Sequence, residues 1–183
     1  MRSFIAIEID ENARRRLGAV RGAGILEGGG VRWVRPESLH LTLKFLGEIA
    51  PSAVPLVTEA MEEASQDVGP FYLELKGLGF FPDARRPRVF WAGIRDRGGG
   101  MARLHARLEE ALGRRGFPMD TRPFHPHLTL ARIKGRLDRP PRMEGRGDDL
   151  FGAQTVHEMV LFKSELRPQG PRYTSLSVVG LKE

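Results

Sequence analysis

His40-Leu41-Thr42-Leu43 and His127-Leu128-Thr129-Leu130 are identical tetrapeptides that begin 87 residues apart in a chain of 183 residues. Each lies in a short hydrophobic run, over residues 39–46 and 127–133, whose length and composition predict a β-strand. Successive side chains of a strand point to opposite faces, so the His and Thr of each copy share one face and the leucines the other. A similar strand in each half of the chain indicates an internal duplication with approximate twofold symmetry.

The rest of the sequence predicts an α+β protein with antiparallel sheets flanked by helices. Strands and helices are interspersed without the regular alternation of a doubly wound fold, and residues 1–183 fit a single domain of two lobes. Loops are expected at 77–87 and 135–149, which are rich in glycine, proline and arginine. The expected strands are residues 2–9, 31–34, 39–46, 71–75, 88–94, 127–133, 155–165 and 173–179, and the expected helices are residues 11–22, about 51–65 and 101–115.

Composition excludes several kinds of chemistry. The chain has no cysteine, which rules out disulfides, thiol catalysis, iron–sulfur clusters and zinc ribbons. No apolar run approaches the roughly 18 residues that a membrane-spanning helix needs. Residues 1–10 have the pattern of a strand and lack the apolar core and cleavage site of a signal peptide. We therefore expect a cytoplasmic protein without a membrane partner.

The basic residues suggest an anionic partner. The formal net charge is +6, and such a field attracts polyanions such as nucleic acid. Arginine greatly outnumbers lysine, which is also typical of a high-GC or heat-adapted genome. The two explanations of the arginine content are compatible, so charge alone does not identify the partner.

The paired His and Thr side chains suit cleavage of a phosphodiester. This reaction needs a base that takes a proton from the attacking oxygen and an acid that protonates the leaving oxygen on the other side of phosphorus. Imidazole titrates near neutrality, so His40 and His127 can divide the two roles. The hydroxyls of Thr42 and Thr129 can donate to the non-bridging phosphate oxygens, whose charge must be held in the transition state. These four residues form a complete site without a metal or another cofactor.

Other readings of the histidines are weaker. Two core strands could each carry a buried, hydrogen-bonded His, but an identical pair of tetrapeptides is then unexplained. His125 and His127 form a His-x-His pair that could ligate zinc, yet a catalytic zinc normally needs three protein ligands and the sequence has no motif for the third. The glycine stretches at 28–30 and 98–100 lack the arrangement of a P-loop. We therefore expect neither a metal nor ATP.

With these two motifs, the sequence resembles the 2H phosphoesterase superfamily, which is named for two H-x-T/S-x motifs. More closely it resembles the LigT-like family of RNA 2′,3′-cyclic phosphodiesterases, long called 2′-5′ RNA ligases. The resemblance covers nearly the whole chain. It includes Arg2, Phe4 and Ala6, Trp33 and Pro36, residues 39–47, residues 126–132, Ser164 and Tyr173.

The resemblance implies two pseudo-twofold-related lobes around a V-shaped cleft, and hydrolysis of RNA 2′,3′-cyclic phosphate ends to 2′-phosphate ends. By family analogy His40 protonates the departing ribose O3′, His127 activates the water, and Arg132 contacts phosphate or base. The symmetry of the two tetrapeptides cannot by itself assign the acid and the base. The expected partner is RNA with cyclic ends, such as fragments of tRNA, bound by a monomer.

Strand alternation alone does not decide whether some residues next to the motifs face the site or the core. Arg132 falls on the leucine face of an ideal strand, and only a strand end, a twist or a bulge would reconcile it with a site role. Phe45 occupies the matching position after His40 and could stack on a base or lie in the core. Lys44 shares the parity of His40 and is expected in the cleft or at a solvated strand end. His105 is expected to be exposed, and Trp91 to belong to the core.

Two alternatives remain. The same histidines could catalyse reversible 2′-5′ ligation of RNA halves, since joining an OH end to a cyclic phosphate needs no nucleotide cofactor. A non-catalytic RNA-binding protein would explain the positive charge but not the duplicated His and Thr strands, because binding alone requires basic and aromatic residues.

Overall fold

The fold is described by a computed structural model over residues 1–143, 145–168 and 170–182. Its strands are β1 (Arg2–Glu8), β2 (Val31–Trp33), β3 (His40–Glu48), β4 (Phe71–Phe81), β5 (Val89–Arg95), β6 (His127–Ile133), β7 (Leu150–Val156), β8 (Glu158–Arg167) and β9 (Gly170–Gly180). Its α-helices are α1 (Glu11–Ala19), α2 (Val54–Ser65) and α3 (Gly100–Arg114), with short 3₁₀ turns at Val20–Ala23, Pro36–Ser38 and Pro51–Ala53.

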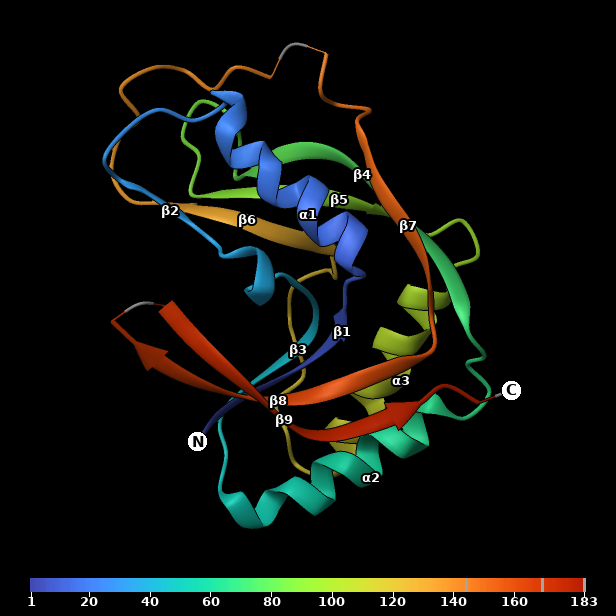
Figure 1. Cartoon of the computed structure of the whole chain (residues 1–183). Helices are drawn as coiled ribbons and strands as arrows, with labels where there is room; N and C mark the ends of the chain where they lie inside the picture. The colour runs from blue at the N-terminus through green and yellow to red at the C-terminus, as the bar shows by residue number, and fades with distance from the viewer. Residues whose placement is uncertain (144, 169, 183) are drawn as a thin grey trace.

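The strands form two antiparallel sheets, which confirms the predicted α+β class. One sheet has the order β3-β1-β8-β9 and the other the order β2-β6-β5-β4-β7. Figure 1 shows the second sheet in the upper half of the view with α1 in front of it, while α2 and α3 lie beside the first sheet below. The two predicted His-x-Thr strands are β3 and β6, so each sheet carries one of them.

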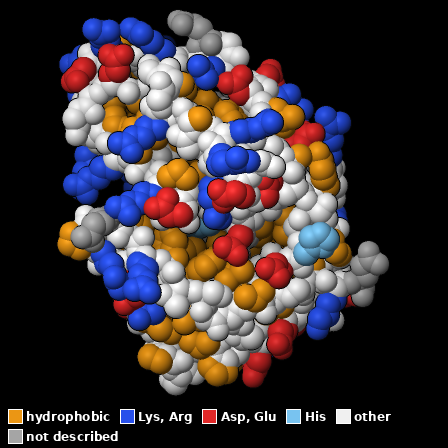
Figure 2. Space-filling view, in the orientation of Figure 1, with side chains coloured by type: hydrophobic (Ala, Val, Ile, Leu, Met, Phe, Trp, Pro, Cys, Tyr) orange, Lys and Arg blue, Asp and Glu red, His pale blue; other side chains and the backbone are white. Residues whose placement is uncertain are grey.

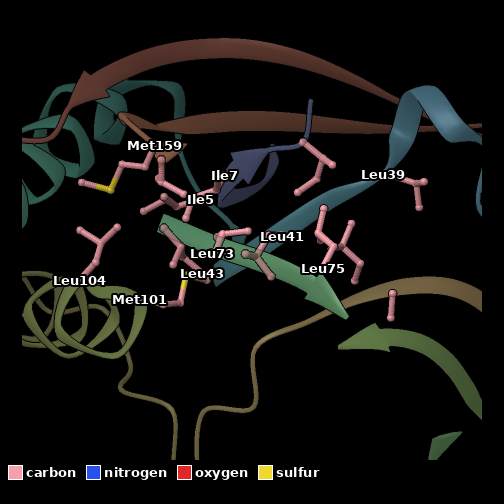
Figure 3. Close-up of a cluster of buried hydrophobic side chains, with 14 of the residues drawn as sticks. Ile5, Ile7, Leu39, Leu41, Leu43, Leu73, Leu75, Met101, Leu104 and Met159 are labelled. Carbon is pink, nitrogen blue, oxygen red and sulfur yellow. The ribbon is translucent and has the colours of Figure 1, made fainter. Parts of the chain in front are cut away.

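A single hydrophobic core joins the two sheets and α3. The inward faces of β1, β3 and β4 and the apolar face of α3 meet there, and their side chains are almost completely buried. Figure 3 shows part of this cluster, which includes Ile5, Ile7, Leu41, Leu43, Leu73, Leu75, Met101, Leu104 and Met159. The leucines of the first tetrapeptide are therefore core residues, as strand alternation predicts.

Several element bounds differ from prediction. The strand expected at 71–75 continues to Phe81, so part of the expected loop at 77–87 belongs to β4. The strand expected at 155–165 is two strands, β7 and β8, because the chain leaves one sheet at Val156 and enters the other at Glu158. Helix α1 begins as predicted, with the Asp10 side chain accepting from the Ala13 amide at 2.8 Å.

No helix within the described ranges combines the length and the apolar character that crossing a membrane would require.

Candidate active site

His40 and His127 have the same local geometry in the two sheets. The Nδ1 atom of His40 lies 2.8 Å from the Ser38 carbonyl oxygen, and that of His127 lies 2.7 Å from the His125 carbonyl oxygen. A carbonyl oxygen can only accept, so Nδ1 of each ring carries the hydrogen and donates it. Nε2 of each ring is then the atom left to exchange protons with a ligand.

Aromatic side chains hold both imidazole rings. Phe4 and Tyr173 pack against the ring of His40, with centroid separations of 4.6 and 5.1 Å. Phe81 packs edge-on against the ring of His127, with a centroid separation of 5.0 Å and an interplanar angle of 83°. The sequence did not predict the role of Phe81, because it lies in a stretch that was expected to be a loop.

Both imidazoles are partly buried, and this changes their titration. Burial lowers the pKa of His40; the hydrogen bond to the Ser38 carbonyl opposes this shift, and the charge of Arg14 adds to it. Burial likewise lowers the pKa of His127, opposed by its bond to the His125 carbonyl and reinforced by the charge of Arg132. Both rings therefore favour the neutral state in the free protein.

A β-bulge lies at the second leucine of each motif strand. Opposite β3, Ala6 pairs with Thr42 but the preceding Ile5 pairs with Lys44, so Leu43 is an extra residue. The pairing of β5 with β6 shows the same shift, and Leu130 is the extra residue there. The two bulges thus occupy the fourth position of both identical tetrapeptides, and each reverses the alternation of the residues that follow.

The bulge in β6 resolves the position of Arg132. Arg132 pairs with Val89, which shares a face of β5 with Trp91, and Trp91 pairs with Thr129. Arg132 is therefore exposed on the same face as His127 and Thr129, despite its odd offset. The structure thus supplies the bulge that a site role for Arg132 required.

The bulge in β3 overturns the prediction for Lys44. Its side chain lies on the core side, with only 3% of the residue exposed, whereas Phe45 is 59% exposed. Lys44 Nζ lies 2.7 Å from a Glu109 carboxylate oxygen and 3.3 Å from an Asp120 carboxylate oxygen. Lys44 thus faces neither the site nor solvent, and Phe45 is the residue that takes the position equivalent to Arg132.

The prediction that Trp91 belongs to the core is wrong. Trp91 lies on the face that carries His127 and Thr129. Its ring lies over Gly79, where an added Cβ would be 2.2 Å from the Trp91 ring. Phe81 packs beside Trp91 at a centroid separation of 5.2 Å. The absence of a side chain at Gly79 therefore leaves the space that the indole occupies against β4.

Two further residues, Tyr173 and Arg132, belong to the surroundings of the motif histidines. Strands β3 and β6 contact each other, although they belong to different sheets. Burial raises the pKa of Tyr173, and the nearby charge of Arg132 opposes that rise. Tyr173 packs on His40, and the charge of Arg132 acts on both Tyr173 and His127, so both side chains lie near the motif histidines. Tyr173 was found from the sequence only through the family resemblance.

A separate group of His105, Glu109 and Asp120 places its ligand atoms within 4.8 Å of one another. Such a set could hold a cation, but the ammonium of Lys44 already lies against both carboxylates. His105 is only partly exposed and stacks on Phe124 with ring centroids 3.8 Å apart, so the prediction of an exposed histidine was wrong.

Comparison with known proteins identifies the family. The LigT like Phosphoesterase family matches residues 7–91 and 95–173. The chain is 33% identical over 181 residues to an Archaeoglobus fulgidus protein named RNA 2′,3′-cyclic phosphodiesterase, covering 97% of this chain and 99% of the relative. It is 36% identical over 164 residues to an Aeropyrum pernix protein of the same name, covering 88% of this chain and 92% of the relative.

Solved structures agree with this match. TT0787 of Thermus thermophilus superimposes with a TM-score of 0.82 at 33% identity, covering 99% of this chain and 98% of that one. Escherichia coli LigT complexed with 3′-AMP superimposes with a TM-score of 0.79 at 28% identity, covering 100% of this chain and 98% of that one. A fold of two antiparallel sheets, each with a His-x-Thr strand, defines a 2H phosphoesterase. More narrowly, this chain belongs to the family of LigT-like phosphoesterases.

Proposed function

We propose that this protein hydrolyses the 2′,3′-cyclic phosphate ends of RNA to 2′-phosphate ends by two-histidine acid–base catalysis, without a metal. The observation that carries the proposal is the matched geometry of His40 and His127, in which a backbone carbonyl binds Nδ1 and leaves Nε2 free. The names of the relatives, which are RNA 2′,3′-cyclic phosphodiesterases, support the substrate.

In the proposed reaction, Nε2 of neutral His127 takes a proton from the attacking water as its oxygen bonds to phosphorus. The bond from phosphorus to O3′ breaks, and Nε2 of protonated His40 gives its proton to O3′. One water is consumed, the 2′-phosphate stays on the ribose, and the histidines have exchanged protonation states. The choice of His40 as acid follows the family resemblance, because the local geometry of the two rings is the same.

The other members of the site would hold the phosphate. Thr42 and Thr129 are half-buried and share strand faces with the histidines, where their hydroxyls can donate to non-bridging oxygens. Arg132 supplies a permanent positive charge on the same face as His127. These roles need no divalent cation, because the hydroxyls and the guanidinium provide the stabilisation of negative charge.

The decisive experiment replaces each histidine by asparagine. The asparagine amide can still donate to the carbonyl that binds Nδ1, but it removes the titratable Nε2. We expect His40→Asn and His127→Asn each to lose at least about 10²-fold in kcat/KM for adenosine 2′,3′-cyclic phosphate in excess EDTA, with 2′-AMP as the wild-type product.

His157→Asn is the matched control, because His157 is exposed between β7 and β8. It should keep wild-type turnover, and all three variants should show wild-type circular dichroism. Near-normal turnover by either motif variant, or loss of wild-type activity in EDTA, would contradict the proposal. Salt-sensitive RNA binding without any wild-type turnover would instead favour a non-catalytic RNA-binding protein.

A further inference from the structure

Two arginines stand opposite each other beside the candidate site. Arg32 of β2 and Arg132 of β6 are cross-strand partners in an antiparallel pair, so their side chains leave the same face of the sheet. Both side chains are exposed. This is the face that carries His127 and Thr129, which places Arg32 one strand further from the histidine than Arg132.

Neither guanidinium has an acidic partner among the residues that the structure describes, since no carboxylate of that part of the chain lies within 4.0 Å. Only some of the other arginines are paired, for example Arg107 with Asp67 at 3.6 Å and Arg139 with Glu27 at 3.5 Å, but Arg32 and Arg132 face each other directly across two strands. Like charges directly opposite each other on a sheet are destabilising. An unneutralised pair at this position therefore points to an anionic ligand that binds between the two guanidinium groups.

The position of the pair defines which anion it fits. Arg132 acts on the titration of His127 and Tyr173, so its end of the pair borders the site proposed for the cyclic phosphate. Arg32 lies on β2, the edge strand of its sheet, so a long ligand can continue past it into solvent. Figure 2 shows Lys and Arg side chains gathered along the left edge of the molecule, where Figure 1 places β2, the end of β8 and the start of β9.

We infer that Arg32 binds the internucleotide phosphate next to the terminal nucleotide of an RNA strand, so that the enzyme prefers RNA ends to cyclic mononucleotides. A guanidinium can bind phosphate oxygens through two parallel N–H donors, which gives both charge and orientation. This inference rests on the proposed function, because the cyclic end must occupy the site between the histidines for the next phosphate to reach Arg32.

The test compares adenosine 2′,3′-cyclic phosphate with the dinucleotide ApA ending in a 2′,3′-cyclic phosphate, which adds a single phosphodiester. Wild-type enzyme should favour the dinucleotide in kcat/KM by about tenfold, the contribution of a charge-assisted contact. In Arg32→Gln this ratio should fall to near one. Absence of the preference in wild-type enzyme, or its survival in Arg32→Gln, would overturn the inference.

Arg103→Gln is the matched control, because it removes the same charge from an exposed position on α3, across the molecule from β2. It should retain the wild-type ratio. The salt dependence provides a second measure: for a single strand, log K changes with log salt by about 0.7 per phosphate contact, so Arg32→Gln should have a slope shallower by about 0.7 with the dinucleotide. An equal loss in both variants would show a general effect of net charge and overturn the assignment to Arg32.

A binding measurement separates failure of this inference from failure of the proposed function. Calorimetry with 2′-AMP and with ApA 2′-phosphate does not require turnover. If wild-type protein turns over neither cyclic substrate, the proposed function fails, yet tighter binding of ApA 2′-phosphate that disappears in Arg32→Gln would still support the phosphate subsite. Equal binding of the two products by wild-type protein would overturn it.

Discussion

At the scale of single residues, the same backbone contact orients the two motif histidines. Each Nδ1 donates to the carbonyl of the residue two positions earlier, Ser38 or His125, so the tautomer is decided by the chain itself. Burial lowers the pKa of both rings, and a different arginine reinforces the shift in each case, Arg14 for His40 and Arg132 for His127. Mutation of one of these arginines should therefore change the pKa of one histidine and not that of the other.

This separation gives a pH prediction. With both pKa values below the usual 6.5, both rings are mostly neutral above that pH, while the proposed reaction needs one of them protonated. The kcat/KM, which reports the free enzyme, should therefore rise as pH falls from about 8 to about 6.5. Arg132→Gln should raise the pKa of His127 and leave that of His40 unchanged, and Arg14→Gln should do the reverse.

The measurement is the titration of the ring protons of His40 and His127 by NMR in the three proteins. Unchanged titration of both rings in both variants would show that the arginine charges do not reach the imidazoles.

At the scale of elements, the bulges in β3 and β6 decide which residues face the site. Simple alternation from His40 and His127 predicted the faces of Thr42 and Thr129 correctly, because these pairs precede the bulges. It failed for Lys44, which lies one residue beyond the bulge. A single extra residue reverses every later side chain, and no residue type in the sequence marks its position.

The packing of Trp91 over Gly79 of β4 gives a prediction at the same scale. Gly79→Ala should force the Trp91 ring to shift, because the new Cβ would lie 2.2 Å from it, and we expect a loss of about 1–3 kcal/mol in the free energy of unfolding. The same shift should lower turnover, because Trp91 pairs with Thr129 and contacts Phe81. Urea denaturation followed by tryptophan fluorescence measures the first effect.

Gly22→Ala is the control, since an added Cβ at Gly22 meets no atom within 4 Å. If Gly79→Ala were as stable and as active as Gly22→Ala, the indole would not depend on the space at position 79.

At the scale of the whole molecule, we propose that residues 1–183 form one two-lobed unit that arose by duplication, with β3 and β6 as equivalent strands. The identical tetrapeptides and the bulge at the same position of both strands support this proposal. A buried group also joins β3 to the segment that leads to β6. Lys44 of β3 pairs with Glu109 of α3, and the Glu109 carboxylate also accepts from the Asp120 amide at 2.8 Å, in the segment that leads to His127.

Breaking this buried pair should weaken the whole fold. In Lys44→Met, the carboxylate of Glu109, which is 6% exposed, would lose its buried ammonium partner, and we expect a loss of about 3–5 kcal/mol in the free energy of unfolding. The double variant Lys44→Met with Glu109→Gln should recover a large part of that loss, because no uncompensated charge remains buried. Urea denaturation of the single and double variants measures the coupling.

A loss below about 1 kcal/mol in Lys44→Met would show that the pair contributes no more than an ordinary surface ion pair.

The sequence by itself determined the fold class, the two motif strands and the shared face of each His and Thr, because hydrophobic alternation is a local property of a strand. Only the tertiary structure decided that Arg132 and Phe45 join those faces, that Lys44 is buried, and that Arg32 stands opposite Arg132. These facts depend on register and bulges, which are set by hydrogen bonds between strands far apart in the chain and leave no pattern in the sequence around each residue.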